Sequence, residues 1–251
     1  MRMDTVSSAD LQLAERLVED GAIQMPLRIS NRVTGAIRCF NRFLAEPDEY
    51  RNQWDLWETE PDGRDITDIG YKDKGAKPGE DAKHIFHWTP DPERLLVARG
   101  VDFTRHEYFL GYGRNIFTIC WREYVDLLRA LDHVMPGYDF HERVRHPRAK
   151  EGSILRFLRY KDTTKEVIAK GHTDKNLITF HLADSHPGLR LGHAGNLYLT
   201  SPDRALVFFG DKMEKITDGK IKALWHYVTD ERAPRDKSLR WAMIFFGHVP
   251  L

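Results

Sequence analysis

The chain has 251 residues, of which 41% are hydrophobic and 30% are charged, which is enough apolar material for a sizeable core and too much for a disordered chain. Lys and Arg number 38 and Asp and Glu number 38, and this balance argues against a dedicated nucleic-acid or membrane-surface binder. Two cysteines, Cys39 and Cys120, exclude a disulfide framework and a cysteine-based zinc site. Because the longest apolar runs are too short to cross a bilayer and the N-terminus lacks an apolar signal core, we expect a cytoplasmic protein without a membrane anchor.

The first half of the chain shows helical periodicity in three places. Apolar residues between Leu11 and Val18 lie mostly on one face of a helix that Gly21 ends. The segment GAIQMPLRI then has strand character, and a second helix follows over residues 33–44. A third helix is predicted over residues 116–135, where Pro-Gly stops it.

Residues 46–91 mix turn residues, charges and large aromatic residues without a clear period. A loop of this length inside a compact domain either is functional or conceals short strands. Tyr71, Phe86 and Trp88 favour an ordered segment packed on the body of the protein over a free linker.

After residue 151 the pattern changes to short β-type segments separated by turn signals such as His186-Pro187-Gly188. These segments are SILRFLRY, NLITFHLA, GLRLGH, NLYLTS, ALVFFGD, KIKALWHYV and LRWAMIFFG. Closely spaced strands of this kind are typical of a sandwich, a barrel or a jelly roll. We therefore expect an α+β fold in a single domain, residues 1–251, in which a helical layer and long loop (1–150) buttress a β core (151–251).

One group of residues has the pattern of a metal site. In an extended segment, residues i and i+2 point to the same side, so His172 and Asp174 can face a ligand together. His226, in the later segment KALWHYV, can supply a third donor from a facing strand. Two imidazoles and one carboxylate on one side of a metal form the facial triad of non-haem Fe(II) oxygenases. A His-x-Asp triplet is common by chance, however, so the surrounding sequence has to decide.

The stretch GHTDKNLITFHLADSHPGLRL resembles the metal-binding segment of the isopenicillin N synthase-like family of Fe(II)- and 2-oxoglutarate-dependent dioxygenases. There a His-x-Asp pair is followed by an apolar strand and a Gly-Leu turn. The resemblance continues through Gly210-Asp211, the Thr217-Asp218-Gly219 hairpin and His226, and LRWAMIFF is similar to the family's closing strand. It spans about residues 153–251, with a fainter likeness in GYKDKGAKPGEDAKHIFHW.

This resemblance implies a double-stranded β-helix, or jelly roll, with Fe(II) bound by His172, Asp174 and His226. It also implies that Arg240 pairs with the distal carboxylate of 2-oxoglutarate, the co-substrate, with O2 consumed and ascorbate as an optional reductant. Decarboxylation of 2-oxoglutarate to succinate is then coupled to hydroxylation, desaturation or cyclisation of a small-molecule substrate. We expect no nucleic-acid partner, and a monomer is the default expectation for an oligomeric state that the sequence does not fix.

Two positions depart from the family pattern or bear on it. Ala242 stands where the family has a Ser that also binds the keto acid, and the hydroxyl of Tyr160 is a candidate replacement. Strand alternation predicts that His181 points away from the side used by His172 and Asp174, and so has a structural role. Two other functions stay open: an Fe(II) oxidase of the same fold that does not use 2-oxoglutarate, favoured by Ala242 alone, and a non-catalytic jelly-roll binding protein.

Overall fold

The computed structural model describes residues 6–56, 58–59, 65–67, 69–75, 81–90, 92–161, 166–232 and 238–250. Its helices are α1 (Ser8–Asp20), α2 (Ser30–Leu44), α3 (Asp48–Asn52), α4 (Pro92–Ala98), the 3-10 helix η1 (Thr104–His106), α5 (Glu107–Val134), α6 (Phe140–Val144), α7 (Pro147–Glu151) and α8 (Asp211–Ile216). Its strands are β1 (Ala22–Pro26), β2 (Glu58–Thr59), β3 (Asp65–Thr67), β4 (Gly70–Lys74), β5 (Lys83–Trp88), β6 (Ile154–Tyr160), β7 (Val167–His172), β8 (Ile178–Asp184), β9 (Leu189–Leu191), β10 (Asn196–Tyr198), β11 (Arg204–Phe209), β12 (His226–Thr229) and β13 (Trp241–Gly247).

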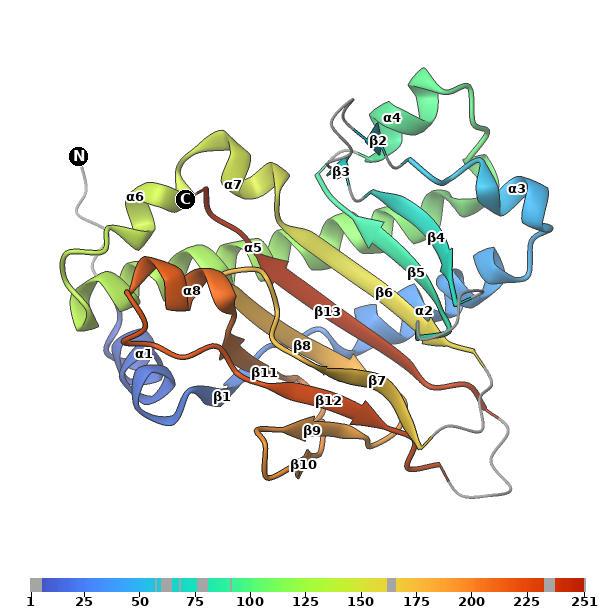
Figure 1. Ribbon diagram of the computed structural model, residues 1–251. Helices are drawn as coiled ribbons and strands as arrows, with labels where there is room; N and C mark the ends of the chain where they lie inside the picture. The colour runs from blue at the N-terminus through green and yellow to red at the C-terminus, as the bar shows by residue number, and fades with distance from the viewer. Residues whose placement is uncertain are drawn as a thin grey trace.

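Two antiparallel sheets form the centre of the described part of the chain (Figure 1). The larger sheet has seven strands in the order β1-β11-β8-β13-β6-β5-β4, and the smaller has four in the order β10-β9-β12-β7. Strands β1, β4 and β5, which come from the first half of the sequence, extend the larger sheet at its two edges. The two halves of the chain are therefore joined by backbone hydrogen bonds.

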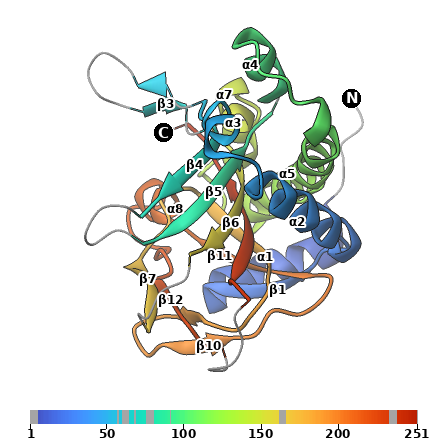
Figure 2. The ribbon, with the colours of Figure 1, turned by 90° about the vertical axis from the view of Figure 1, so that its right-hand side faces the viewer.

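Helices α1, α2 and α5 lie together on one face of the larger sheet, as the side view shows (Figure 2). Successive strand residues point to opposite faces, so alternate large side chains of the sheet meet these helices. The ring centroids of Phe157 in β6 and Phe109 in α5 lie 5.0 Å apart, and those of Phe245 in β13 and Phe117 in α5 lie 5.5 Å apart. This aromatic layer fixes the larger sheet against α5.

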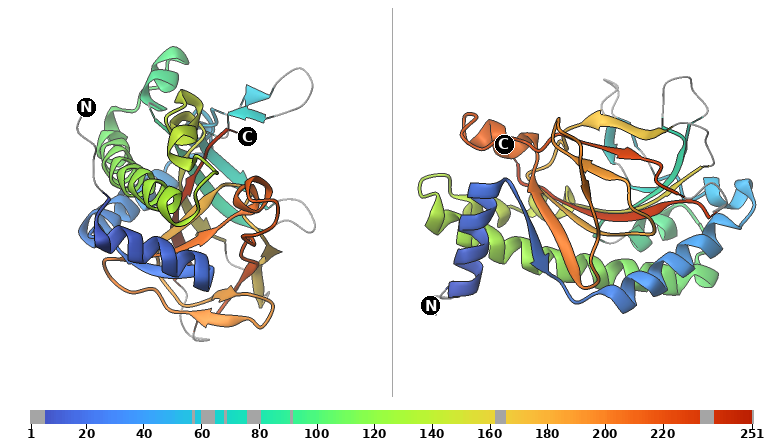
Figure 3. Two further views of the ribbon diagram at one scale, coloured as in Figure 1. Left: turned by 90° about the vertical axis from the view of Figure 1, so that its left-hand side faces the viewer. Right: turned by 90° about the horizontal axis from the view of Figure 1, so that it is seen from below.

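The opposite face of the larger sheet packs on the smaller sheet. In the view from below (Figure 3, right), the green helix α5 and the orange-red strand β12 lie on opposite sides of the red strand β13. Leu158 of β6 and Ala242 of β13 belong to a second apolar cluster together with Ala169, Leu189 and Val228 from the smaller sheet. The predicted α+β jelly roll with N-terminal helices is confirmed, and the space between its sheets is where a ligand can enter.

Two elements differ in extent from their sequence predictions. Helix α5 begins at Glu107 rather than near residue 116, because Gly111 and Gly113 obscure its first turns in the sequence. A Cβ at Gly113 would lie 2.4 Å from the Trp88 ring, so tight packing there requires the residue that weakens the helical pattern. Strand β5, in the region without a period, is buried at four consecutive positions and therefore shows no alternation.

No helix in the described ranges is both long enough and apolar enough to cross a bilayer. Of the aromatic residues in the region 46–91, Trp54, Tyr71, Phe86 and Trp88 are buried in the core, whereas Trp57 lies outside the described residues.

Candidate metal centre

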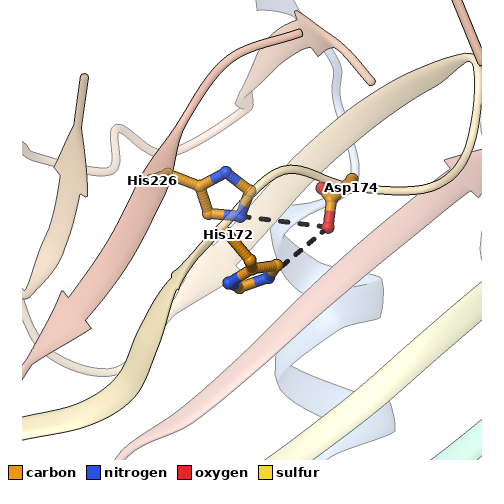
Figure 4. Close-up of side chains that lie close together, drawn as sticks. All are labelled: His172, Asp174 and His226. Atoms are coloured by element: carbon orange, nitrogen blue, oxygen red, sulfur yellow. Dashed lines mark ion pairs between the residues drawn. The ribbon is translucent and has the colours of Figure 1, made fainter. Parts of the chain in front are cut away.

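Three side chains from separate segments meet at one end of the space between the sheets. His172 is the last residue of β7, Asp174 lies in the turn after it, and His226 is the first residue of β12. In the antiparallel pairing of these strands, His226 stands directly opposite His172. One potential ligand atom from each residue lies within 4.8 Å of the other two (Figure 4). The structure thus brings together the three residues that the sequence singles out, and we call them the His-Asp-His cluster.

Backbone carbonyls fix the tautomer of both imidazole rings. Nδ1 of His172 lies 2.7 Å from the carbonyl oxygen of Lys170, and Nδ1 of His226 lies 3.1 Å from that of Leu224. A carbonyl oxygen only accepts, so each Nδ1 carries the proton and donates it. In the neutral form of such a ring Nε2 has the lone pair, and the two Nε2 atoms lie 3.7 and 3.9 Å from Oδ1 of Asp174. This is the tautomer in which Nε2 can bind a metal ion.

A buried hydroxyl orients the carboxylate. Thr179 of β8 donates its hydroxyl hydrogen to Oδ2 of Asp174 at 2.6 Å, while Oδ1 is the oxygen nearest the two rings. The backbone carbonyl of Asp174 accepts from the N–H of Asp211 at 2.7 Å, and a Cβ on the adjacent Gly210 would lie 2.6 Å from that carbonyl oxygen. Thr179 has no site role in the sequence prediction, and the available signal was a hydroxyl residue in the strand that follows Asp174.

Burial favours the neutral form of the His226 ring. His226 and Asp174 are 6% and 9% exposed, whereas the His172 side chain is 47% exposed. Burial lowers the pKa of His226, and the charge of Asp174 opposes this only in part, so the ring is neutral near pH 7. Two imidazoles and one carboxylate form a mixed nitrogen and oxygen donor set, which fits Fe(II).

The cluster forms one end of a pocket between the two sheets. Apart from the cluster, the pocket is lined by Lys83, Arg156, Leu158, Tyr160, Ala169, Thr179, His181, Leu189, Phe208, Val228, Arg240, Ala242, Ile244 and Phe246. Among the described lining residues, Lys83, Arg156 and Arg240 are cations, and Asp174 is the carboxylate. Guanidinium and ammonium groups at these positions can bind an anionic ligand.

Arg240 enters the pocket from the segment just before β13, and it is 2% exposed. Its Nη2 donates to Oδ2 of Asp184 at 2.6 Å, and its Nε donates to the carbonyl oxygen of His186 at 3.2 Å. Oδ1 of Asp184 accepts from the hydroxyl of Thr200 at 2.8 Å, and His181 Nε2 lies 3.2 Å from Oδ2. Burial by itself raises the pKa of Asp184, but the His181 hydrogen bond and the neighbouring positive charges lower it below the usual value.

The turn after β8 needs a glycine to hold Arg240 in place. Gly188 has φ of +144°, and a Cβ there would lie 2.2 Å from the carbonyl oxygen of Thr229 and 3.5 Å from Nε of Arg240. The N–H of Thr229 donates to the carbonyl of Gly188 at 2.9 Å. A larger residue would separate these segments, which explains the glycine in the Gly-Leu turn.

The other two sequence-predicted positions also reach the pocket. Tyr160, at the end of β6, lies beside Arg240, with the guanidinium carbon 5.6 Å from its ring centroid. Burial raises the pKa of Tyr160 to about 12, so its hydroxyl stays protonated. Ala242 lines the pocket without a polar group, directly across from Leu158 and Asp184 in its two strand pairings.

The prediction that His181 points away from the ligand side was wrong. His181 lines the pocket and contacts Asp184. The alternation rule did not apply because His172 ends β7 of the smaller sheet, whereas His181 lies in β8 of the larger sheet. The turn between these strands changes sheet, so counting odd and even positions across it gives no direction. Arg156 and Lys83, which line the pocket, and Asp184, which holds Arg240, were not identified from the sequence, because their places depend on which strands are neighbours.

Comparison with known proteins agrees with this geometry. Residues 149–249 match the family described as the 2OG-Fe(II) oxygenase superfamily. No curated protein matches the chain significantly in sequence. Similar solved structures include a 2OG-Fe(II) oxygenase family protein from Caulobacter crescentus, at 21% identity over 97% of this chain and 84% of that chain, with a TM-score of 0.72.

Two further structures have a similar fold. An oxygenase from Shewanella oneidensis is 18% identical over 98% of this chain and 88% of its own, with a TM-score of 0.69. The dioxygenase for auxin oxidation 1 from Arabidopsis thaliana, in complex with 2-oxoglutarate, is 15% identical over 99% of this chain and 91% of its own, with a TM-score of 0.68. These identities are low, so the structures establish the fold, and the family match covers the region that contains the His-Asp-His cluster and Arg240.

The resemblance predicted from the sequence is confirmed for the superfamily, while the isopenicillin N synthase-like subfamily stays a prediction. Residues 149–249 match the 2OG-Fe(II) oxygenase superfamily, and this match supports a dioxygenase that uses Fe(II) and 2-oxoglutarate.

Proposed function

We propose that this enzyme binds Fe(II) through His172, Asp174 and His226, anchors 2-oxoglutarate at Arg240, and oxidises a small molecule in the pocket between the sheets. The observation that carries the proposal is the shared tautomer of the two rings, whose Nε2 lone pairs both lie near one oxygen of Asp174. The family match over residues 149–249 supports it, because that region contains all four residues.

Each residue of the His-Asp-His cluster is oriented by a neighbouring group. The backbone carbonyls that accept from Nδ1 orient the rings, and Thr179 orients the carboxylate. Three protein ligands leave coordination positions for a keto acid and O2. Bound Fe(II) with 2-oxoglutarate and O2 supplies the oxidising chemistry, in which 2-oxoglutarate becomes succinate and carbon dioxide while the substrate is hydroxylated, desaturated or cyclised.

The far end of the pocket suits the distal carboxylate of the keto acid. Arg240 offers a planar, permanently charged guanidinium that is already held by Asp184 and the backbone. The protonated hydroxyl of Tyr160 can donate a second hydrogen bond where Ala242 cannot. Apolar side chains of the smaller sheet, such as Leu189 and Val228, limit the access of water to the space between the two ends.

The test is an anaerobic titration of the metal-free protein with Fe(II) and then with 2-oxoglutarate, followed by visible absorption. We expect a weak charge-transfer band that requires both additions, because it reports chelation of the metal by the keto acid. His226→Ala removes the band, and Arg240→Ala weakens keto-acid binding while Fe(II) binding is retained. His193→Ala is the matched control, since His193 is exposed, stacks on Trp225 and lies outside the cluster.

Other results assign other functions. Fe(II) binding without a band, together with O2 consumption that does not depend on 2-oxoglutarate, indicates an oxidase. If Fe(II) does not bind the folded protein, the catalytic proposal is wrong and a binding protein is the better description.

A further inference from the structure

The pocket contains a cation that neither the metal centre nor the keto-acid anchor explains. Arg156 of β6 lines the pocket, and its register partners are His87 of β5 and Ile244 of β13. Tyr160, beside Arg240, lies four residues further along the same strand, which corresponds to about 13 Å at 3.3 Å per residue. Arg156 is therefore set well apart from the anchor along the floor of the pocket.

The contacts of Arg156 direct it toward the metal end. Its guanidinium carbon lies 4.6 Å from the ring centroid of Phe246. Phe246 pairs across the sheet with Thr179, the residue that holds Asp174. Arg156 therefore contacts Phe246, and Phe246 is the strand neighbour of Thr179, which orients the Asp174 carboxylate.

The ring of His87 orients the guanidinium of Arg156. Nε of Arg156 donates to Nε2 of His87 at 2.7 Å, and His87 is 1% exposed. To accept this bond, Nε2 must carry a lone pair, so the ring is neutral with its proton on Nδ1. The bond to His87 uses Nε of Arg156. A carboxylate can be bound by the two terminal nitrogens of a guanidinium, so Arg156 can contact His87 and a carboxylate at the same time.

Apolar side chains make up much of the pocket wall. Leu158, Phe208, Ile244 and Phe246 come from the larger sheet, and Leu189 comes from the smaller one. A ligand with an apolar or aromatic body buries surface against these side chains, while its anionic end reaches the arginine.

We propose that Arg156 recognises the primary substrate, and that this substrate is a small carboxylic acid with an apolar body. The proposal rests on the proposed function, since it takes the metal end for Fe(II) and Arg240 for 2-oxoglutarate. Arg156 is a specificity-determining residue in this scheme, because it selects the substrate without contacting the metal. Lys83 lies at the Tyr160 end of the pocket, 3.3 Å from Asp81, and is not needed for this recognition.

The experiment compares acids with their uncharged amides on the protein loaded with Fe(II) and saturating 2-oxoglutarate under anaerobic conditions. The probes are phenylacetate, 4-phenylbutanoate and octanoate, each with its primary amide, and binding is measured by calorimetry. We expect at least one acid to bind tenfold or more tightly than its amide. Arg156→Gln abolishes this preference and leaves the affinity for 2-oxoglutarate within twofold, whereas Arg156→Lys keeps part of the preference because it keeps the charge.

Arg159→Gln is the matched control. Arg159 lies on the same strand but contacts Asn41 of α2 on the helix side of the sheet, so its loss leaves the acid preference intact. Thermal unfolding of each variant separates loss of recognition from loss of fold, and Arg156→Lys serves if Arg156→Gln does not fold.

Three results overturn the proposal: no acid is preferred over its amide, the preference survives Arg156→Gln, or Arg156→Gln weakens 2-oxoglutarate binding tenfold. The last result makes Arg156 the keto-acid anchor instead. Failure of the proposed function is recognised separately, because the wild-type protein then gives no charge-transfer band even when no acid is added.

Discussion

The two ends of the pocket differ in how their polar groups are paired. We call the end at the His-Asp-His cluster the metal end and the end at Arg240 the anchor end. At the metal end, the donor atoms of His172, Asp174 and His226 lie close together with lone pairs facing one another, and one of the rings is half exposed. At the other end, Arg240 is buried and already paired with Asp184 at 2.6 Å. The metal end thus presents acceptor atoms that a cation can bind, whereas the guanidinium at the anchor end already has partners within the protein.

This difference has consequences for binding. The metal end gains interactions when a cation binds, since three groups that face one another acquire a common partner. The anchor end has to share Arg240 between Asp184 and an incoming carboxylate, so two like charges compete for one guanidinium. We therefore expect the metal end to determine whether ligands bind, and the anchor end to determine how tightly the keto acid is held and how stable the fold is.

The largest effect is expected from Arg240→Leu, which breaks the ion pair and leaves the Asp184 carboxylate buried without its main partner. Removal of one member of a buried pair costs about 3–5 kcal/mol of unfolding free energy. Urea unfolding measures this loss. The double variant Arg240→Leu/Asp184→Leu recovers most of it, because it removes the charge that was left unpaired.

The control for this prediction is Arg204→Leu, at an exposed position of β11, for which the change stays within about 0.5 kcal/mol. A loss below about 1 kcal/mol for Arg240→Leu contradicts the description of the anchor end as a tightly coupled pair.

At the metal end, Thr179→Val removes the hydroxyl that orients Asp174 and keeps the shape of the side chain. Loss of such a supporting hydrogen bond lowers metal affinity by about 10–100-fold. Fe(II) titration under anaerobic conditions measures the change. Thr179→Ser keeps the hydroxyl and is expected to retain most of the affinity, and equal affinities for the Val and Ser variants would argue that the Asp174 orientation does not depend on this bond.

Asp184→Asn tests the competition at the anchor end directly. Asn still accepts a hydrogen bond from Arg240 but carries no charge, so we expect 2-oxoglutarate to bind roughly tenfold more tightly, or about 1.4 kcal/mol. Fe(II) affinity stays unchanged, which distinguishes this effect from one at the metal end. If keto-acid binding weakens instead, Asp184 acts by positioning Arg240 rather than by competing for it.

The same variant has a pH signature. The pKa of Asp184 is below its usual value in the folded protein, so the carboxylate stabilises the fold above the ordinary Asp pKa of about 3.9. That contribution is lost as the pH falls through the folded-state value. Wild type is therefore more stable than Asp184→Asn at pH 7, and urea unfolding at a series of pH values shows the gap narrowing below about pH 4.

The smallest effect is expected from Ala242→Ser, which restores the hydroxyl of the family pattern on a pocket-facing position of β13. One additional hydrogen bond contributes about 1 kcal/mol, which is roughly a fivefold gain in affinity for 2-oxoglutarate. The charge-transfer titration measures it, and an unchanged affinity means that Tyr160 or Arg240 already satisfies the carboxylate. Tyr160→Phe distinguishes these two, because it removes only the hydroxyl.

Much of the architecture can be predicted from the sequence, for local reasons. The periodicity around Leu11–Val18 and over residues 33–44 predicts α1 and α2 because a helix that packs on one side repeats its apolar residues at 3.6 positions. Segments such as LRWAMIFFG predict strands for a similar reason. The His172-Thr173-Asp174 triplet, the later His226 and Arg240 are found from spacing and from resemblance to a family.

Other features depend on neighbours that are distant in sequence. The sequence of strand β5 shows no alternation of apolar and polar residues because both faces of the strand are covered. The start of α5 is not evident from the sequence because it contains Gly113, which packs against Trp88. Whether His181 faces the pocket depends on a change of sheet between β7 and β8, which no local rule encodes.

The helices and strands are thus predictable from short-range periodicity, and the residues of the candidate metal centre are predictable from spacing together with resemblance to a family. Three contacts of the pocket are not predictable in this way: Thr179 with Asp174, Asp184 with Arg240, and Arg156 with Phe246. They join segments that come together when the strands pair, and the direction of a side chain there depends on which strands are neighbours.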